Sequence, residues 1–136
     1  ADIVTVMAFA SDKTIEGVAR EAHARGRRVM ADLLGAQDAA AAAQRVRALG
    51  ADIACLHVAV DAQQGQSGPA AAQVAAVSAA CSGMPLAVAG GIRESTARAL
   101  CAAGAEWLIV GGAVCNAPDA CAAAAAIRMA MQGKGL

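Results

Sequence analysis

Aromatic side chains are almost absent from this chain of 136 residues, which has one Trp, one Phe and no Tyr. A core without aromatics must be built from Ala, Val, Leu and Ile at close backbone spacing, and this suits helices packed on a parallel sheet. Hydrophobic residues make up 58% of the chain, and a domain of this length can bury a core of its own. The composition therefore favours an α/β fold.

An excess of charge of either sign is also missing, since 11 basic residues balance 11 acidic ones. Without a basic patch or an acidic tail, we expect no nucleic-acid partner. No apolar run reaches the roughly 18 residues of a membrane span. The first residues lack the charged and then apolar pattern of a secretion signal. These features predict a cytoplasmic protein that does not bind membranes.

The five cysteines form no C-x-x-C pair, and their number is odd. This pattern is neither a disulfide framework nor a zinc signature. We expect reduced, small and mostly buried side chains. A catalytic role for Cys115, which follows a glycine pair, is the weaker alternative.

Two similar stretches, 85–92 (PLAVAGGI) and 107–113 (WLIVGGA), organise the rest of the chain. Each is a short apolar strand that ends in two glycines before an expected helix. Glycine permits positive φ and a close backbone approach, and a helix amino end presents unpaired N–H groups. Two such turns on neighbouring strands predict a site for a phosphate monoester, whereas the simpler alternative is a pair of tight turns. The four glycines are Gly90, Gly91, Gly111 and Gly112.

Strands and helices are expected to alternate along the whole chain. The expected strands are 3–9, 28–34, 53–60, 86–89 and 107–110, and the expected helices are 14–25, 37–49, 69–80, 95–102 and 117–131. Regular alternation predicts a parallel sheet with right-handed crossovers. The strand entries Gly50-Ala-Asp and Gly104-Ala-Glu are alike, and Ala1-Asp2 resembles the middle of such a turn. We therefore expect a partial (βα)8 barrel, with residues 1–136 as a single C-terminal segment that lacks the first three βα units.

Active sites of parallel α/β barrels lie at the carboxyl ends of the strands. This rule selects Asp32, His57 and the loop residues Asp61, Gln63 and Gln64. A histidine in an apolar strand is often a core residue, but the neighbouring glycine turns favour proton transfer by His57. A buried carboxylate needs a partner, so Asp32 could cap a helix, contact a substrate or bind a metal.

Three segments carry a resemblance to a known family: 56–69 (LHVAVDAQQGQSGP), 86–92 (LAVAGGI) and 108–114 (LIVGGAV). They resemble the 3-hexulose-6-phosphate synthases of the orotidine-5′-monophosphate decarboxylase suprafamily of (βα)8 barrels. The segment 1–17 resembles the family's fourth strand and the helix after it, and the segment 29–35 resembles its fifth strand. The resemblance covers nearly all of the chain but only the last five of the family's eight βα units.

The resemblance implies a reaction and a set of roles. The reaction is the magnesium-dependent aldol addition of formaldehyde to ribulose 5-phosphate, which gives a 3-hexulose 6-phosphate, in a homodimeric enzyme. His57 would move a proton at the enediolate carbon, and Asp32 would face the substrate. The backbone amides of the four glycines would bind the phosphate without a side-chain cation.

Departures from the family patterns bear on the alternatives. The sister enzyme, 3-keto-L-gulonate-6-phosphate decarboxylase, typically has arginine where this chain has Val60 and Gly112, which favours the synthase. No aspartate is followed two residues later by lysine, so the suprafamily's Asp-x-Lys motif is absent. We therefore assign no metal ligand, expect the isolated 136 residues to be inactive, and keep a non-catalytic, phosphosugar-binding or self-associating half-barrel as a further alternative.

Overall fold

The structure is a computed structural model that describes residues 1–58 and 70–133. The strands are β1 (Ile3–Met7), β2 (Arg28–Asp32), β3 (Ile53–His57), β4 (Leu86–Ala89) and β5 (Trp107–Ile109). The helices are α1 (Asp12–His23), α2 (Ala39–Ala48), α3 (Ala71–Ala80), α4 (Glu94–Ala102), α5 (Gly112–Cys115) and α6 (Ala120–Met131). All pairs of adjacent strands are parallel, in the order β1-β2-β3-β4-β5. This confirms the predicted α/β alternation.

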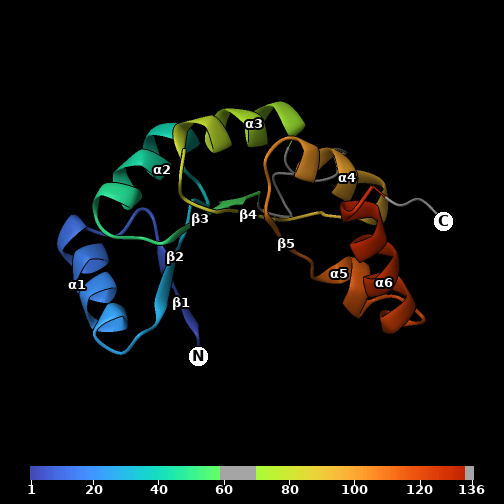
Figure 1. The fold of residues 1–136 in the computed structure, drawn as a ribbon, viewed down its shortest axis with the longest axis horizontal. Coiled ribbons are helices and arrows are strands. Elements are labelled where there is room, and N and C mark those ends of the chain that lie inside the picture. Colours follow the sequence, from blue (N-terminus) through green and yellow to red (C-terminus); the bar gives the residue numbers. More distant parts are fainter. Residues whose placement is uncertain (59–69, 134–136) are drawn as a thin grey trace.

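The sheet forms an open arc rather than a closed barrel (Figure 1). Helices α1 to α4 follow the convex side of the arc, and its concave side faces away from them (Figure 1). None of the helices among the described residues has the length and apolar character to cross a membrane.

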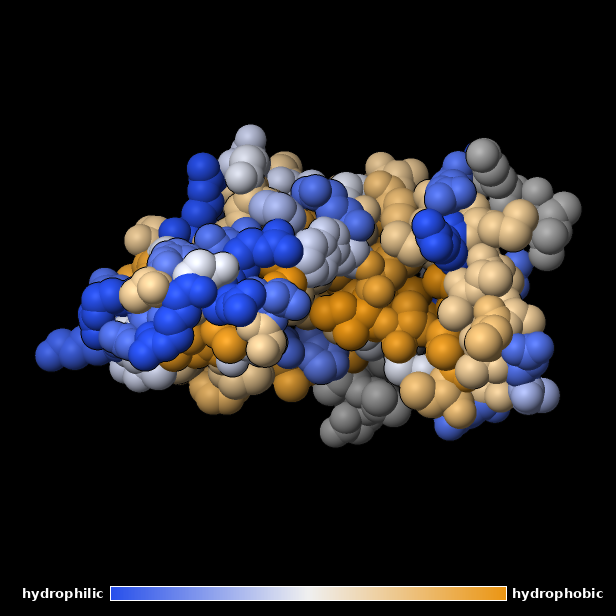
Figure 2. Space-filling model, turned by 60° about the horizontal axis from the view of Figure 1, so that its bottom comes forward, coloured by the Kyte–Doolittle hydropathy of each residue, from blue (hydrophilic) through white to orange (hydrophobic). Residues whose placement is uncertain are grey.

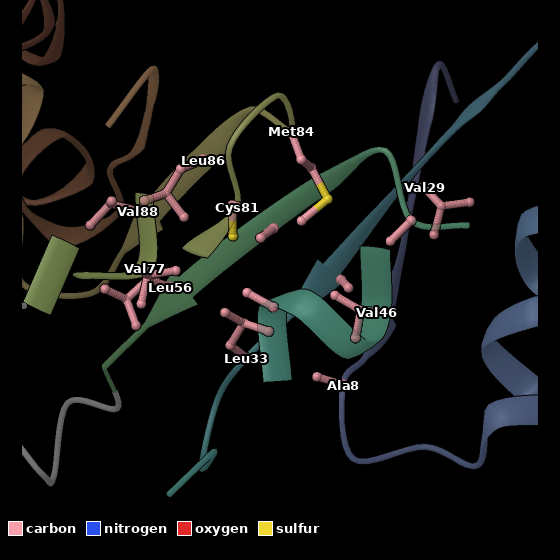
Figure 3. Packing of buried hydrophobic residues seen from close by; sticks show 14 of the residues in the cluster. Ala8, Val29, Leu33, Val46, Leu56, Val77, Cys81, Met84, Leu86 and Val88 are labelled. Atoms are coloured by element: carbon pink, nitrogen blue, oxygen red, sulfur yellow. The ribbon is translucent and has the colours of Figure 1, made fainter. Parts of the chain in front are cut away.

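The main core lies between the convex side of the sheet and the helices. Alternate strand residues such as Val29, Leu56 and Val88 pack there against α2 and α3 residues such as Val46 and Val77 (Figure 3). All five side chains are at most 2% exposed. Because these residues are small and branched, the helices approach the sheet closely without aromatic side chains, as the composition predicted.

Local sequence signals set the helix ends. The Ser11 hydroxyl accepts from the Thr14 amide at 3.3 Å and begins α1. The buried residues Ile15, Ala19 and Ala22 recur at helical spacing on one face of α1. Gly26, with a φ of 65°, follows its end.

The concave side carries a second and smaller cluster, formed by Met30, Ile53, Cys55, Ala87 and Ala89. Trp107 packs against this cluster, and the Arg28 guanidinium lies 5.3 Å from the centre of its ring. Hydrophobic surface gathers in the middle of this side when it is turned forward (Figure 2). The concave side is therefore mainly apolar along the middle strands, from Met30 of β2 to Trp107 of β5.

The structure corrects three expectations. Apolar strands of a parallel sheet are expected to be buried on both faces, but Val4 of β1 is 36% exposed and Thr5 is exposed, because β1 is the edge strand of the sheet. The last helix, α6, begins at residue 120 rather than 117, and the short helix α5, which was not expected, precedes it. An arginine on an alanine-rich helix is expected to be solvated, but Arg45 of α2 pairs with Asp12 and donates to two carbonyls of the loop after β1, Ala8 O at 2.7 Å and Ala10 O at 3.0 Å.

The cysteine prediction is half right. All five cysteines are free, and Cys55 and Cys81 are buried. Cys115 and Cys121 are exposed, because they lie on the outer surface of α5 and α6 rather than in the core.

Candidate active site

A histidine and a carboxylate meet at the carboxyl edge of the sheet. Asp32 ends β2 and His57 ends the neighbouring strand β3, and by the alternation of strand residues they lie on the same side of the sheet as Met30 and Cys55, the concave side. His57 Nδ1 lies 3.0 Å from Asp32 Oδ2, and the other carboxylate oxygen accepts from the Leu34 amide at 2.9 Å. Both oxygens of Asp32 are thus engaged. The ring of His57 is oriented through Nδ1, which leaves Nε2 available for a proton transfer.

This pairing adds a contact that the roles left open for Asp32 did not include. The carboxylate caps no helix, but closes a turn on Leu34 and holds His57. The side chain of His57 is 32% exposed, whereas that of Asp32 is only 16% exposed. Asp32 is therefore less accessible than the histidine that it contacts, and its contact with a substrate stays a prediction.

The first glycine turn follows β4 and requires glycine for steric reasons. Gly90 has a φ of 94° and Gly91 a φ of 61°. A Cβ atom on Gly90 would lie 2.1 Å from the carbonyl oxygen of Val58. The turn is therefore pressed against the end of β3, immediately beside His57, and the prediction of a positive φ and a close approach is confirmed here.

The second glycine turn, after β5, differs from the first. Gly111 has a φ of −105°, and a Cβ atom there would meet nothing within 4 Å. Gly112 begins α5, and its Cβ atom would lie 3.3 Å from Asn116 Nδ2. Positive φ is thus not what favours glycine in this pair, and the space in front of Gly111 is open to a ligand.

One hollow of about 790 Å³ joins these elements. It is lined by His57 and by the predicted glycines of both turns: Gly90, Gly91, Gly111 and Gly112. The walls between them are apolar, with Ile92, Ile109 and Ile127. The structure therefore brings the predicted histidine and both predicted glycine turns to one site, whose size suits a small phosphorylated molecule.

Sequence reasoning missed three polar residues that line the same hollow, Arg93, Glu94 and Asn116. The resemblance implied a phosphate site without a side-chain cation; this stays a prediction, although Arg93 lies on the wall of the hollow. The available signal was its place directly after Gly-Gly-Ile, at the amino end of a predicted helix. The predicted loop residues Asp61, Gln63 and Gln64, together with Val60, lie outside the described residues.

The described residues do not form a complete magnesium site. No group of three or more His, Cys, Asp or Glu side chains is close enough to hold a metal within residues 1–58 and 70–133. At the hollow, the Asp32 carboxylate is already engaged by His57 and by the Leu34 amide. Magnesium therefore stays a prediction of the family resemblance, and we derive no chemical step through it.

Cys55 lies on the concave side between these groups, but it is not a nucleophile. Burial, and secondly the charge of Asp32, raise the pKa of the Cys55 thiol to about 12. A thiol with this pKa is protonated at neutral pH. The exposed Cys115 is not among the described residues that line the hollow. The weaker alternative of a catalytic Cys115 therefore finds no support in the geometry.

A parallel α/β arc with a histidine and a phosphate-sized hollow at its carboxyl edge agrees with the comparisons to known proteins. The family model described as "Orotidine 5'-phosphate decarboxylase / HUMPS family" matches residues 1–127. The chain belongs to this family. It is 40% identical over 131 residues to a 3-hexulose-6-phosphate synthase of Mycobacterium gastri, covering 96% of this chain and 62% of that protein. It is 36% identical over 135 residues to 3-hexulose-6-phosphate synthase 1 of Staphylococcus saprophyticus, covering 98% and 63%.

Solved structures of such enzymes share the fold. A crystal structure of 3-hexulose-6-phosphate synthase superposes with a TM-score of 0.87 at 40% identity, over 96% of this chain and 62% of that one. The enzyme of that name from Salmonella typhimurium gives a TM-score of 0.89 at 28% identity, over 98% and 63%. The chain thus spans 62 to 63% of the length of these relatives.

Proposed function

We propose that the protein catalyses the aldol addition of formaldehyde to ribulose 5-phosphate, which gives a 3-hexulose 6-phosphate. Residues 1–136 would be one segment of a larger (βα)8 barrel, and would supply its phosphate site and its acid/base histidine. The observation that carries the proposal is the His57–Asp32 pair at 3.0 Å beside both glycine turns. Relatives at 40% and 36% identity with the name of this synthase support it.

His57 has the position and the partner for the proton transfers of this reaction. Its Nε2 removes a proton from C1 of ribulose 5-phosphate, the terminal carbon beside the C2 ketone, and this forms the enediolate. That carbon then bonds to the carbon of formaldehyde, and the proton passes to the former aldehyde oxygen. Asp32 holds Nδ1 and stabilises the imidazolium between these two steps.

The phosphate would lie against the backbone amides that follow β4 and β5. The amino end of α4 begins there, at Glu94, so unpaired N–H groups and the positive end of its dipole face the hollow. Binding of the phosphate at this end of the hollow places the sugar toward His57. The remaining expectations, a magnesium ion, a homodimer and a cytoplasmic location, are parts of the same proposal that rest on the family resemblance.

The decarboxylase alternative is less well supported. The solved structures named 3-keto-L-gulonate-6-phosphate decarboxylase or KGPDC are 24% identical or less and show the shared fold alone. The synthases are the relatives of higher identity.

An assay of formaldehyde consumption with ribulose 5-phosphate and magnesium tests the proposal on the whole protein. His57→Gln should lower kcat by a factor of about 10²–10⁴, the usual contribution of general acid–base catalysis. The matched control is His23→Gln, since these are the two histidines of the chain. His23 pairs with Asp52 at 2.8 Å, just before β3 at the amino edge of the sheet. A His57→Gln enzyme within about twofold of the wild type would refute the assignment.

A further inference from the structure

We propose that the Arg93 guanidinium binds the phosphate group of the substrate and thereby selects phosphorylated over unphosphorylated ketoses. This inference rests on the proposed function, because it assigns one more residue to that site. It also adds a cationic side chain to a phosphate site that the resemblance built from backbone amides alone.

The position of Arg93 is fixed by its backbone. Arg93 follows the turn at Gly90 and Gly91 and is the N-cap of α4, in an extended conformation with φ −140° and ψ 167°. Its amide donates to Thr96 Oγ1 at 3.1 Å, and the Thr96 hydroxyl donates back to the Arg93 carbonyl at 3.0 Å. Two reciprocal hydrogen bonds thus hold the Arg93 backbone at the wall of the hollow, and its side chain starts from a defined point.

Arg93 brings a positive charge to this wall of the hollow. Within the described part of the chain, no carboxylate pairs with the Arg93 guanidinium, whereas the guanidinium groups of Arg25, Arg27 and Arg45 are paired. Arg93 is the one Lys or Arg among the described residues that line the hollow. A guanidinium has a planar set of donors that matches two phosphate oxygens, so it is the side chain suited to this task.

Two features of the surroundings oppose a role of Arg93 in phosphate binding. Glu94 also lines the hollow, and its carboxylate opposes an anion there. Arg93 in addition borders a second hollow, of about 490 Å³, which it shares with Ser95 and Arg98. The competing interpretation is therefore that the Arg93 side chain lies in solvent between the two hollows and does not bind the phosphate. Arg98 lies on the same helix but borders only the second hollow, and so offers a control with the same change of charge.

The test is a calorimetric titration of the whole protein with three probes: ribulose 5-phosphate, unphosphorylated ribulose and inorganic phosphate. Arg93→Gln should raise the Kd for ribulose 5-phosphate and for phosphate about tenfold, which is the lower end for a charge-assisted hydrogen bond at an exposed site. The Kd for ribulose should not change. Arg93→Lys should recover part of the loss, because lysine keeps the charge but not the paired donors.

The controls separate a direct contact from a general field effect. Arg98→Gln should bind all three probes as the wild type does. In turnover assays, Arg93→Gln should raise KM for ribulose 5-phosphate with little change in kcat, because the phosphate is remote from the reacting carbon. Circular dichroism of each variant checks that it is folded. If Arg93→Gln is not folded, the Kd values of Arg93→Lys are compared with those of the wild type instead.

Three results would overturn the inference. Arg93→Gln could bind ribulose 5-phosphate as tightly as the wild type, or Arg98→Gln could weaken binding equally. In either case the proposed function stands, while the role of Arg93 does not. A wild-type protein that fails to distinguish ribulose 5-phosphate from ribulose would instead remove the phosphate site itself, and both proposals with it.

Discussion

Replacing Gly90 by alanine should destabilise the protein strongly, because the β4 turn has no room for a methyl group. The new Cβ atom would lie 2.1 Å from Val58 O and 3.1 Å from Val58 C, both backbone atoms that cannot rotate away. The φ of 94° at Gly90 adds a cost of about 1–2 kcal/mol for an L-residue. Relief of the contact requires β3 and β4 to separate at the pair His57–Ala89. We expect a loss of about 3–5 kcal/mol in the free energy of unfolding.

The second glycine turn provides the matched control. Gly111→Ala places the same methyl group where φ is −105° and nothing lies within 4 Å. Its free energy of unfolding should change by less than about 1 kcal/mol. Urea denaturation followed by circular dichroism measures both variants. Equal stabilities of Gly90→Ala and Gly111→Ala would contradict the steric argument, as would a Gly90→Ala protein as stable as the wild type.

Three other substitutions or reagents probe the site and its surroundings. Asp32→Asn should lower kcat at least about tenfold with little change in KM, because His57 loses the carboxylate that orients it; an unchanged kcat in steady-state assays would contradict this role. Iodoacetamide at a pH of about 8 should label Cys121 of the folded protein and spare Cys55, whose pKa is raised to about 12, and mass spectrometry of peptides reads the two sites separately. Arg45→Met should lower the free energy of unfolding by about 1–2 kcal/mol, because two backbone carbonyls lose their donor; a change below about 0.5 kcal/mol in urea titrations would show that water replaces it.

Several features were readable in the sequence because they depend on neighbours along the chain. The apolar run before Gly90 defines a buried strand, and β4 has the predicted bounds 86–89. Ser11 begins α1, and Gly26 follows its end at positive φ, because capping and left-handed backbone conformations are local events. The alternation of such segments was sufficient to predict five parallel strands.

The chemistry of the site was decided by contacts between residues far apart in sequence. Asp32 and His57 are 25 positions apart, and their hydrogen bond depends on the register of β2 against β3. The sequence marked both residues as candidates but left three roles open for Asp32. Only the position of the two strand ends showed that the aspartate contacts the histidine.

The exposure of β1 and the position of Arg93 could likewise not be predicted from the sequence. The amino-acid pattern of an apolar strand does not show whether the strand lies at the edge or at the centre of a sheet. The exposure of Val4 therefore depends on which strands lie beside β1. An arginine after a glycine turn can point to solvent or to a site, and the arc of the sheet places Arg93 on the wall of the hollow that also contains His57. The sequence by itself determined the strands, the caps and the turn that requires glycine, because these depend on local backbone and side-chain preferences. The tertiary structure decided the contact between Asp32 and His57, the shape of the hollow and the position of Arg93 on its wall, because these depend on strand register and on the curvature of the sheet.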